Sequence, residues 1–288
     1  MEIILGKTAG FCYGVKRAVE GVKEQVENSN EIVFCLGEIV HNKEVIKELK
    51  SKGVTFIDNI DESKGKTIIR AHGVEKKVYE KAKKQEIELI DYTCPNVLKI
   101  HEIVEDYYKQ GYFVFLCGSK EHPENKGTIS YCEDRYYIIE KEKDIWKALD
   151  VLKDSGIKKL LVIVQTTYSL ENFYIIEEII GNELPCNIEL VVKNTICKAT
   201  ELRQKETEEL SKQVDYMIII GGENSSNTRK LYEIAKCNCK NSVCVETESE
   251  LKIEEIKKYQ KVGIMAGAST PQSSIQNVIN ALQEYATL

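Results

Sequence analysis

Three segments of the chain repeat one order of features, and this repetition restricts the fold more than any other property of the sequence. Each segment has an apolar stretch, then a cysteine, then a helix-forming stretch, and the three cysteines are Cys12, Cys94 and Cys197. A second apolar stretch ends in glycine 25, 24 and 24 residues later, at Gly37, Gly118 and Gly221. Apolar strands that alternate with helices indicate parallel α/β units.

Polar loops recur at matching places in the three segments. The first loop holds a polar residue 29, 28 and 28 residues after the cysteine, at His41, His122 and Ser225. A later turn holds another at 60, 72 and 72 residues, at His72, Thr166 and Ser269. Packing does not require polar spacings to agree. We therefore predict three small parallel-sheet α/β lobes in a pseudo-threefold arrangement, with one large doubly wound sheet as the alternative.

The repeats also predict where the lobes begin and end. We expect lobe 1 at residues 13–95, lobe 2 at 96–193 and lobe 3 at 194–288. Ligands of parallel sheets gather beyond the carboxyl ends of the strands. Three lobes around one axis would therefore surround a central cleft that contains all three cysteines. At the second cysteine, we expect Asp91 and Thr93 to cap the helix that starts near Pro95.

Composition and charge exclude several classes of protein. No apolar run approaches the roughly 20 residues that a membrane helix needs. The first residues, MEIILGKTAG, lack the basic and apolar regions of a signal peptide, so we expect a cytoplasmic protein that has no membrane partner. A formal charge of -6 without a basic stripe argues against nucleic-acid binding. No exposed apolar helix face is evident, so we expect a monomer.

The matched cysteines are candidate metal ligands. A reducing compartment disfavours disulfides, and the positive end of a helix dipole stabilises a nearby thiolate. Zinc with a histidine as fourth ligand is one possibility, and an iron–sulfur cluster with one iron lacking a cysteine is the other. Structural zinc sites usually use closely spaced pairs, whereas these cysteines lie 82 and 103 residues apart. The wide spacing favours the cluster. Three further cysteines in CNCKNSVC have no counterpart in the other segments, and we interpret them as bystanders.

The polar loops indicate an anion site with one acidic group beside it. Histidines at strand ends and hydroxyl and amide groups at helix starts are suitable donors for a small diphosphate. The candidates are His41, His72, His122, Ser225, Ser226, Asn227 and Ser269. Glu124 would be repelled by a bound anion unless it carries or relays a proton.

Nine motifs give the chain a strong resemblance to the 4-hydroxy-3-methylbut-2-enyl diphosphate reductase family. They are GFCYGVKRA, GEIVHN, RAHGV, DYTCP, GSKEHPE, QTTYS, NTICKAT, GGENSSNT and GASTP. They occur in the family's order and close to its spacing. The resemblance extends essentially from end to end of the chain.

The resemblance implies a specific cofactor, site and reaction. Cys12, Cys94 and Cys197 would hold one [4Fe–4S] cluster per chain, with an open iron that binds the substrate hydroxyl. The diphosphate would contact the anion-site residues named above and Thr166, and the catalytic residues would be Glu124, Thr166 and His122. Residues 1–12 would join lobe 3.

The implied reaction is the last step of the methylerythritol phosphate (non-mevalonate) route to isoprenoids. Reductive dehydroxylation would give isopentenyl and dimethylallyl diphosphate, with electrons from an external one-electron donor such as ferredoxin or flavodoxin. Two rivals stay open. Quinolinate synthase is another three-lobed, three-cysteine cluster enzyme, but its substrates carry carboxylates and no diphosphate. A zinc-stabilised binding module would have no catalysis at all.

Overall fold

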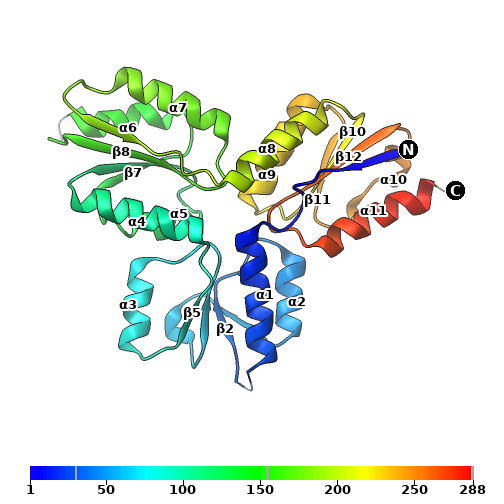
Figure 1. Ribbon diagram of the computed structural model, residues 1–288, viewed down its shortest axis with the longest axis horizontal. Coiled ribbons are helices and arrows are strands. Elements are labelled where there is room, and N and C mark those ends of the chain that lie inside the picture. The colour runs from blue at the N-terminus through cyan, green and yellow to red at the C-terminus, as the bar shows by residue number, and fades with distance from the viewer. Residues whose placement is uncertain (30, 154–155, 287–288) are drawn as a thin grey trace. The chain divides into compact units, whose positions relative to one another are not determined.

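The strands of the protein form three separate four-stranded sheets, as described by a computed structural model that covers residues 1–29, 31–153 and 156–286. All neighbouring strands are parallel. The strand orders are β3-β2-β4-β5, β7-β6-β8-β9 and β11-β10-β12-β1, so one topology occurs three times (Figure 1). The predicted fold of three parallel α/β sheets is confirmed, and the described residues do not form one large sheet.

The first sheet is the smallest. Its strands in chain order are β2 (Phe34–Leu36), β3 (Thr55–Ile57), β4 (Thr67–Ile69) and β5 (Leu89–Asp91). The short helix η1 (Ile60–Glu62) and the helix α3 (Lys76–Lys84) pack against one of its faces, where Ile60 and Ala82 join the buried strand residues. Two more helices flank β2 in sequence, namely α1 (Tyr13–Glu27) and α2 (Lys43–Ser51).

The second sheet is covered by helices on both faces. Its strands are β6 (Phe113–Cys117), β7 (Tyr136–Ile139), β8 (Lys159–Val164) and β9 (Glu189–Val192). Alternate residues of a strand point to opposite faces. Accordingly, Val162 and Val164 pack with α6 (Asp144–Lys153) and α7 (Leu170–Glu183), whereas Leu161 and Ile163 pack on the side of α4 (Pro95–Lys109). The helix α5 (Pro123–Ile129) follows β6 and lies beside α4.

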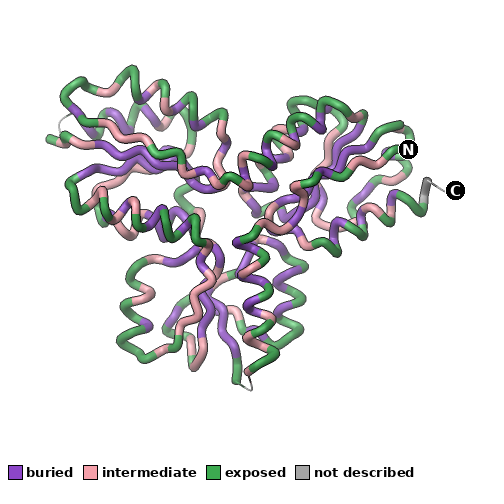
Figure 2. Tube along the Cα trace, in the orientation of Figure 1, coloured by how far each residue is buried: buried purple, intermediate pink, exposed green. Residues whose placement is uncertain are grey.

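The third sheet combines the two ends of the chain. Its strands are β1 (Glu2–Leu5), β10 (Tyr216–Ile220), β11 (Ser242–Val245) and β12 (Lys261–Ala266), and β1 pairs with β12. One face packs against α10 (Ile253–Ile256) and α11 (Gln272–Ala286), and the other against α8 (Lys198–Ser211) and α9 (Ser226–Asn238). The short helix η2 (Glu248–Glu250) follows β11. Figure 2 shows the buried central strands between more exposed helices.

The chain divides into two compact units. The first comprises Met1–Lys23, Val40–Lys52 and Lys198–Leu288, and contains the third sheet. The second comprises Glu24–Ile39 and Gly53–Cys197, and contains the other two sheets. The lobe boundaries at 13–95, 96–193 and 194–288, and a central cleft between the lobes, stay predictions. In the part of the chain that the structure describes, no helix is both long and apolar enough to cross a bilayer.

The strand order explains why polar residues at certain strand ends matter. In each sheet the chain leaves two adjacent central strands toward opposite sides, namely β2 and β4, β6 and β8, and β10 and β12. Such a topological switch point is where open parallel sheets bind ligands, beyond the carboxyl ends of the two strands. The polar loops identified in the sequence follow these strands.

Candidate active site

Each of the three matched cysteines lies directly before a helix, as predicted. Cys12 precedes α1, Cys94 precedes α4 and Cys197 precedes α8. The backbone N–H of each donates to a carbonyl in a turn that follows a central strand: Cys12 to Ala268 (3.2 Å), Cys94 to Ala71 (3.0 Å) and Cys197 to Thr166 (3.0 Å). Among the described residues none of the three forms a disulfide, and each is only partly buried. The backbone therefore fixes each cysteine beside one of the predicted polar turns.

Several other cysteines are core residues. Burial raises the pKa of Cys35, Cys117 and Cys132 to about 12, so these groups stay protonated thiols near neutral pH. Cys237 and Cys239 lie at the carboxyl end of α9, whereas the Ser225 loop lies at its amino end. A helix of 13 residues is about 20 Å long. Cys237 and Cys239 are therefore remote from this loop. Their interpretation as bystanders stays a prediction.

The predicted cap of α4 is wrong. Cys94 itself occupies the N-cap position, and its side chain makes no capping hydrogen bond. Asp91 instead accepts a hydrogen bond from the backbone N–H of Thr93 at 2.7 Å, which makes a local turn before the helix. Pro95 occupies the first turn as expected. The aspartate therefore shapes the loop that presents Cys94 and does not cap the helix.

Glu124 and Thr166 form a buried two-point contact at the switch point of the second sheet. The backbone N–H of Thr166 donates to Oε1 of Glu124 at 2.7 Å, and its hydroxyl donates to Oε2 at 2.6 Å. Only 2% of Glu124 is exposed. Because the carbonyl of Thr166 accepts the hydrogen bond from Cys197, one residue connects the carboxyl group to a candidate ligand.

Burial controls the protonation of this carboxyl group. Desolvation raises the pKa of Glu124, and the two hydrogen bonds from Thr166 oppose the rise only in part. A buried carboxyl group without a cationic partner favours its neutral form. When protonated, its O–H can donate to the Thr166 hydroxyl, whose own proton then turns outward. The pair is thus suited to pass a proton to a bound molecule.

His122 is both the start of α5 and a candidate anion donor. Its Nδ1 accepts a hydrogen bond from the backbone N–H of Glu124 at 3.3 Å, so it is the N-cap of the helix. In the neutral ring with Nδ1 as acceptor, the proton is on Nε2. The ring of His72 meets that of His122 edge to face, with centroids 5.4 Å apart. The structure therefore brings together two of the predicted diphosphate donors within one unit.

Buried amides hold this corner in place, and neither Asn125 nor Gln165 was among the predicted site residues. Asn125 donates to the backbone oxygen of Ser119 (2.7 Å) and to Oε1 of Gln165 (2.8 Å). Gln165 in turn donates to the hydroxyl of Thr167 at 2.9 Å. The loop after β6 is thereby tied to the loop after β8, which keeps Glu124 in contact with the residue after Gln165.

The serine-rich loop of the other unit begins α9. The Ser225 hydroxyl accepts from the backbone N–H of Thr228 at 3.3 Å and caps the helix. Asn227 is only 3% exposed, and neither its side-chain oxygen nor its nitrogen has a hydrogen-bond partner among the described residues. A buried amide without partners is costly unless a ligand or water satisfies it. Asn227 is therefore placed to bind a polar ligand.

The backbone of His41 lies against the same loop. The Ser269 hydroxyl donates to the His41 carbonyl at 3.2 Å. A Cβ atom at Gly222 would lie 2.8 Å from this carbonyl oxygen, which is closer than real contacts allow. Glycine is thus required at position 222 for the close approach. Two predicted binding residues, His41 and Ser269, are in direct contact.

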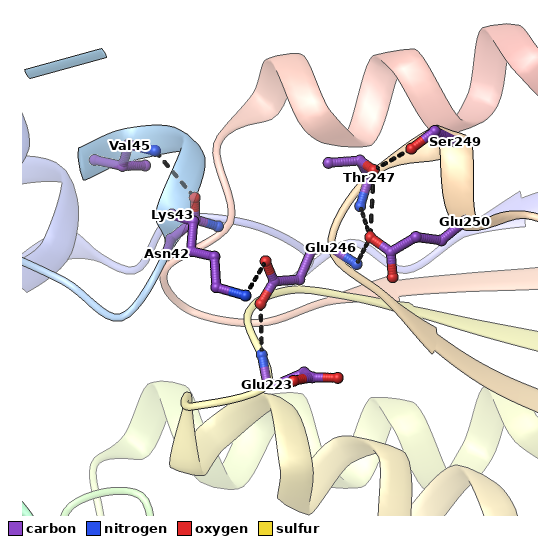
Figure 3. A network of polar contacts seen from close by, with 8 residues as sticks. All are labelled: Asn42, Lys43, Val45, Glu223, Glu246, Thr247, Ser249 and Glu250. Atoms are coloured by element: carbon purple, nitrogen blue, oxygen red, sulfur yellow. Dashed lines mark hydrogen bonds and ion pairs between the residues drawn. The ribbon is translucent and has the colours of Figure 1, made fainter. Parts of the chain in front are cut away.

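A network of charged side chains stabilises the close contact between the His41 carbonyl and Gly222 (Figure 3). Glu246, at the end of β11, accepts from the backbone N–H of Glu223 at 3.0 Å and pairs with the Lys43 ammonium at 3.3 Å. Glu250 accepts from the backbone N–H groups of Glu246 (3.1 Å) and Thr247 (3.0 Å). Because Lys43 is two residues after His41, Glu246 links the His41 segment to the glycine-rich loop after β10.

Substitution of Gly222 should therefore damage the anion site. We expect Gly222→Ala to weaken binding of inorganic diphosphate because the new methyl group displaces the His41 carbonyl. Gly181→Ala is the matched control, since nothing lies within 4 Å of a Cβ atom at this helical position. The control should be slightly more stable than the parent, by about 0.5–1 kcal/mol. Calorimetric titration of both variants tests this. Equal affinities in the two variants would contradict the role of the close approach.

Two residues of α8 hold the loop that carries Cys12. Arg203 is buried and donates from Nε to the Thr8 carbonyl and from Nη2 to the Gly10 carbonyl, both at 2.8 Å. Glu206 accepts from the backbone N–H groups of Lys7 (2.6 Å) and Thr8 (2.8 Å). The helix that begins after Cys197 thus positions the loop before Cys12.

The fourth histidine, His101, has a packing role. It is 2% exposed and stacks on Tyr131 with ring centroids 4.6 Å apart. Burial lowers the pKa of His101 to about 4, so its ring is neutral near pH 7.

The predicted site residues fall into two sets, one in each unit. The second unit holds Cys94, Cys197, His72, His122, Glu124 and Thr166, and the first holds Cys12, His41, Ser225, Ser226, Asn227 and Ser269. Within each set the structure places residues in contact, as described above. The meeting of the two sets around one cluster stays a prediction.

A buried carboxyl group with a raised pKa lies at the switch point of a parallel sheet and is connected to a cysteine before a helix, which indicates an α/β enzyme. The chain matches the LytB protein family over residues 3–283. It is similar to the 4-hydroxy-3-methylbut-2-enyl diphosphate reductases of Caldanaerobacter subterraneus subsp. tengcongensis (40% identity over 98% of this chain and 97% of the relative) and Aquifex aeolicus (40%, over 99% and 96%). The chain belongs to the LytB protein family.

Solved structures agree with this assignment. One is described as (E)-4-hydroxy-3-methyl-but-2-enyl diphosphate reductase, the terminal enzyme of the non-mevalonate pathway, and matches with a TM-score of 0.71 and 40% identity over 99% of this chain and all of the other. The reductase from Plasmodium falciparum matches with a TM-score of 0.90 and 32% identity, over 98% and 88%. The resemblance recognised in the nine motifs and the expected class, an enzyme of the reductase type, are confirmed.

Proposed function

We propose that the protein catalyses reductive dehydroxylation of 4-hydroxy-3-methylbut-2-enyl diphosphate to isopentenyl and dimethylallyl diphosphate. The observation that carries the proposal is the buried contact of Glu124 with Thr166, whose carbonyl accepts from Cys197. A proton source fixed to a metal-ligand candidate is what such a reaction requires. The names of the relatives supply the substrate.

The cofactor in this proposal is one [4Fe–4S] cluster, held by Cys12, Cys94 and Cys197. The donor set fits: each of the three cysteines is partly exposed, is outside any disulfide of the described residues, and is held before a helix by a backbone hydrogen bond. When bound, a cluster with one iron lacking a cysteine supplies one-electron transfer and a Lewis acid for oxygen. An external donor such as ferredoxin or flavodoxin would provide the electrons.

The remaining residues bind the diphosphate and move protons. His41, His72, His122, Ser225, Ser226, Asn227, Thr166 and Ser269 would orient the substrate. The reaction breaks the allylic C–O bond, forms a C–H bond and releases water, and it consumes two electrons and two protons. Protonated Glu124 would supply a proton through the Thr166 hydroxyl, and the Nε2–H of His122 would donate to the phosphate. A cytoplasmic location and a monomeric state are part of the proposal.

Metal analysis combined with turnover tests the function directly. Protein purified without oxygen should contain about four iron and four sulfide per chain. With a strong artificial reductant, it should convert the substrate to the two five-carbon diphosphates. One zinc per chain would favour a zinc-stabilised module instead. A protein that holds a cluster but lacks this turnover, and that inorganic diphosphate does not protect, would favour a quinolinate synthase-like enzyme.

His41→Ala tests the anion site. We expect substrate affinity to fall by about 1.5–3 kcal/mol, because the variant loses a hydrogen bond to a charged group. The backbone contacts of residue 41 with Ser269 and Gly222 do not need the ring, so the loop should be retained. Lys47→Ala, an exposed change in α2, is the control and should bind as the parent does. Calorimetry and the cluster spectrum are the measurements. Loss of the cluster with unchanged affinity would make His41 a ligand and contradict the proposal.

A further inference from the structure

Asn96 contacts a candidate cluster ligand from another part of the second unit. It is the second residue of α4, two positions after Cys94, and its Nδ2 lies 3.1 Å from the Sγ of Cys197. A bound thiolate has no proton to donate, so the amide N–H is the group that faces the sulfur. The contact joins the start of the Cys94 helix to Cys197.

The requirements of helix formation do not explain why residue 96 is an asparagine. The N-cap of α4 is Cys94, which makes no side-chain capping bond, and Pro95 fills the first helical position. Asparagine is a weaker helix former than leucine or lysine. Its side chain is exposed, so core packing does not select it either. Its amide donates a hydrogen bond to Cys197.

An N–H group that points at a ligand sulfur has two effects on an iron–sulfur centre. It orients the thiolate, as groups outside the ligand set do in metal sites. It also stabilises the extra negative charge of the reduced cluster, which makes reduction more favourable. We infer that Asn96 is a positioning residue that holds Cys197 and raises the reduction potential of the cluster. The inference rests on the proposed function, since it requires that Cys197 is a ligand.

A series of three side chains of similar size tests the inference. Asn96→Leu removes the N–H donor, and Asn96→Asp replaces it by a negatively charged acceptor. At a fixed ambient potential, we expect the ratio of reduced to oxidised cluster to fall about tenfold in N96L, which equals about 59 mV for a one-electron couple. In N96D, the ratio of reduced to oxidised cluster should fall further than in N96L. A redox titration followed by electron paramagnetic resonance measures the ratio.

The control is Asn238→Leu. Asn238 is also an exposed helical asparagine, and its amide donates to the Ile234 carbonyl at 2.9 Å. This variant should keep the parent potential. Iron content and the thermal unfolding of the iron-free proteins separate positioning from a general loss of stability. A variant N96L that unfolds like the parent but retains less iron also supports the hydrogen bond.

The two proposals fail in different ways. If the parent binds no cluster, the proposed function is wrong. If the parent binds a cluster but N96L and N238L have the same potential and the same iron content, Asn96 does not act on Cys197, and the inference alone is overturned. A potential that rises in N96D would also overturn it, because a negative charge near the sulfur disfavours reduction.

Discussion

If Cys197 is a cluster ligand as proposed, the Cys197→Ser variant should purify without an iron–sulfur cluster and without reductase activity. A serine hydroxyl is a poor ligand for the soft iron–sulfur centre, and only two of the three thiolates would remain. The same result is expected for Cys12→Ser and Cys94→Ser, because all three cysteines hold matching positions before their helices. Iron, sulfide and the visible spectrum are measured in protein prepared without oxygen.

Cys237→Ser is the matched control for the ligand variants. Cys237 is exposed and lies at the end of α9 opposite the Ser225 loop. It should keep the iron, the spectrum and the turnover of the parent. A Cys197→Ser variant with a full cluster would contradict the ligand assignment. Loss of iron from the Cys237→Ser variant would show that the wrong group of cysteines had been chosen.

The topology was predictable because polar spacing carries more information than apolar spacing. Apolar strands such as YMIII and KVGIMA fit many α/β folds. The recurrence of His41, His122 and Ser225 at nearly equal distances from the cysteines distinguished three equivalent sheets from one large sheet. The structure confirms this, since each sheet has the same strand order. The contact of Glu124 with Thr166 follows from that order, because β6 and β8 are neighbours.

Residues that hold the site from outside were not predictable. Each of four such residues acts through a contact with a residue 23 to 195 positions away in the chain: Asn96, Arg203, Gln165 and Glu246. Side chains of these types also occur on ordinary protein surfaces, so the residue type alone does not identify the contact that each of them makes. The error at Asp91 has a similar origin. An aspartate before a helix can cap it or close a turn before it, and only the backbone geometry decides between the two.

The Glu124→Gln variant should lose turnover while it retains the cluster and the substrate. General acid catalysis is worth about 10²–10⁴-fold in rate, so we expect turnover to fall at least about 100-fold. Glutamine has almost the same size, and its Oε1 can still accept from the Thr166 N–H. Its Nε2–H can donate to the Thr166 hydroxyl, as the protonated acid does, but it cannot give up a proton. Steady-state turnover under a strong artificial reductant measures the effect.

Glu121→Gln is the control for this variant. Glu121 lies three residues earlier, is exposed, and pairs with Lys126 at 2.8 Å. This ion pair lowers the pKa of Glu121, so the group is ionised near neutral pH and cannot serve as an acid. The control should turn over at close to the parent rate. A similar loss in both variants would indicate a disturbed α5 and not a missing proton.

The dependence of the free energy of unfolding on pH tests the raised pKa of Glu124 independently of turnover. Because burial raises the pKa of Glu124 above its ordinary value near 4.5, the folded state binds this proton more tightly than the unfolded state does. The stabilisation is fully present below about pH 4.5 and is lost as the pH rises from there through the raised value. Glu124→Gln cannot ionise, so between pH 4 and pH 8 its free energy of unfolding should fall less than that of the parent. Urea unfolding of the two iron-free proteins measures this difference. If the two proteins show the same pH dependence, and the variant turns over within a few-fold of the parent, Glu124 is a structural residue of α5 and another group supplies the proton.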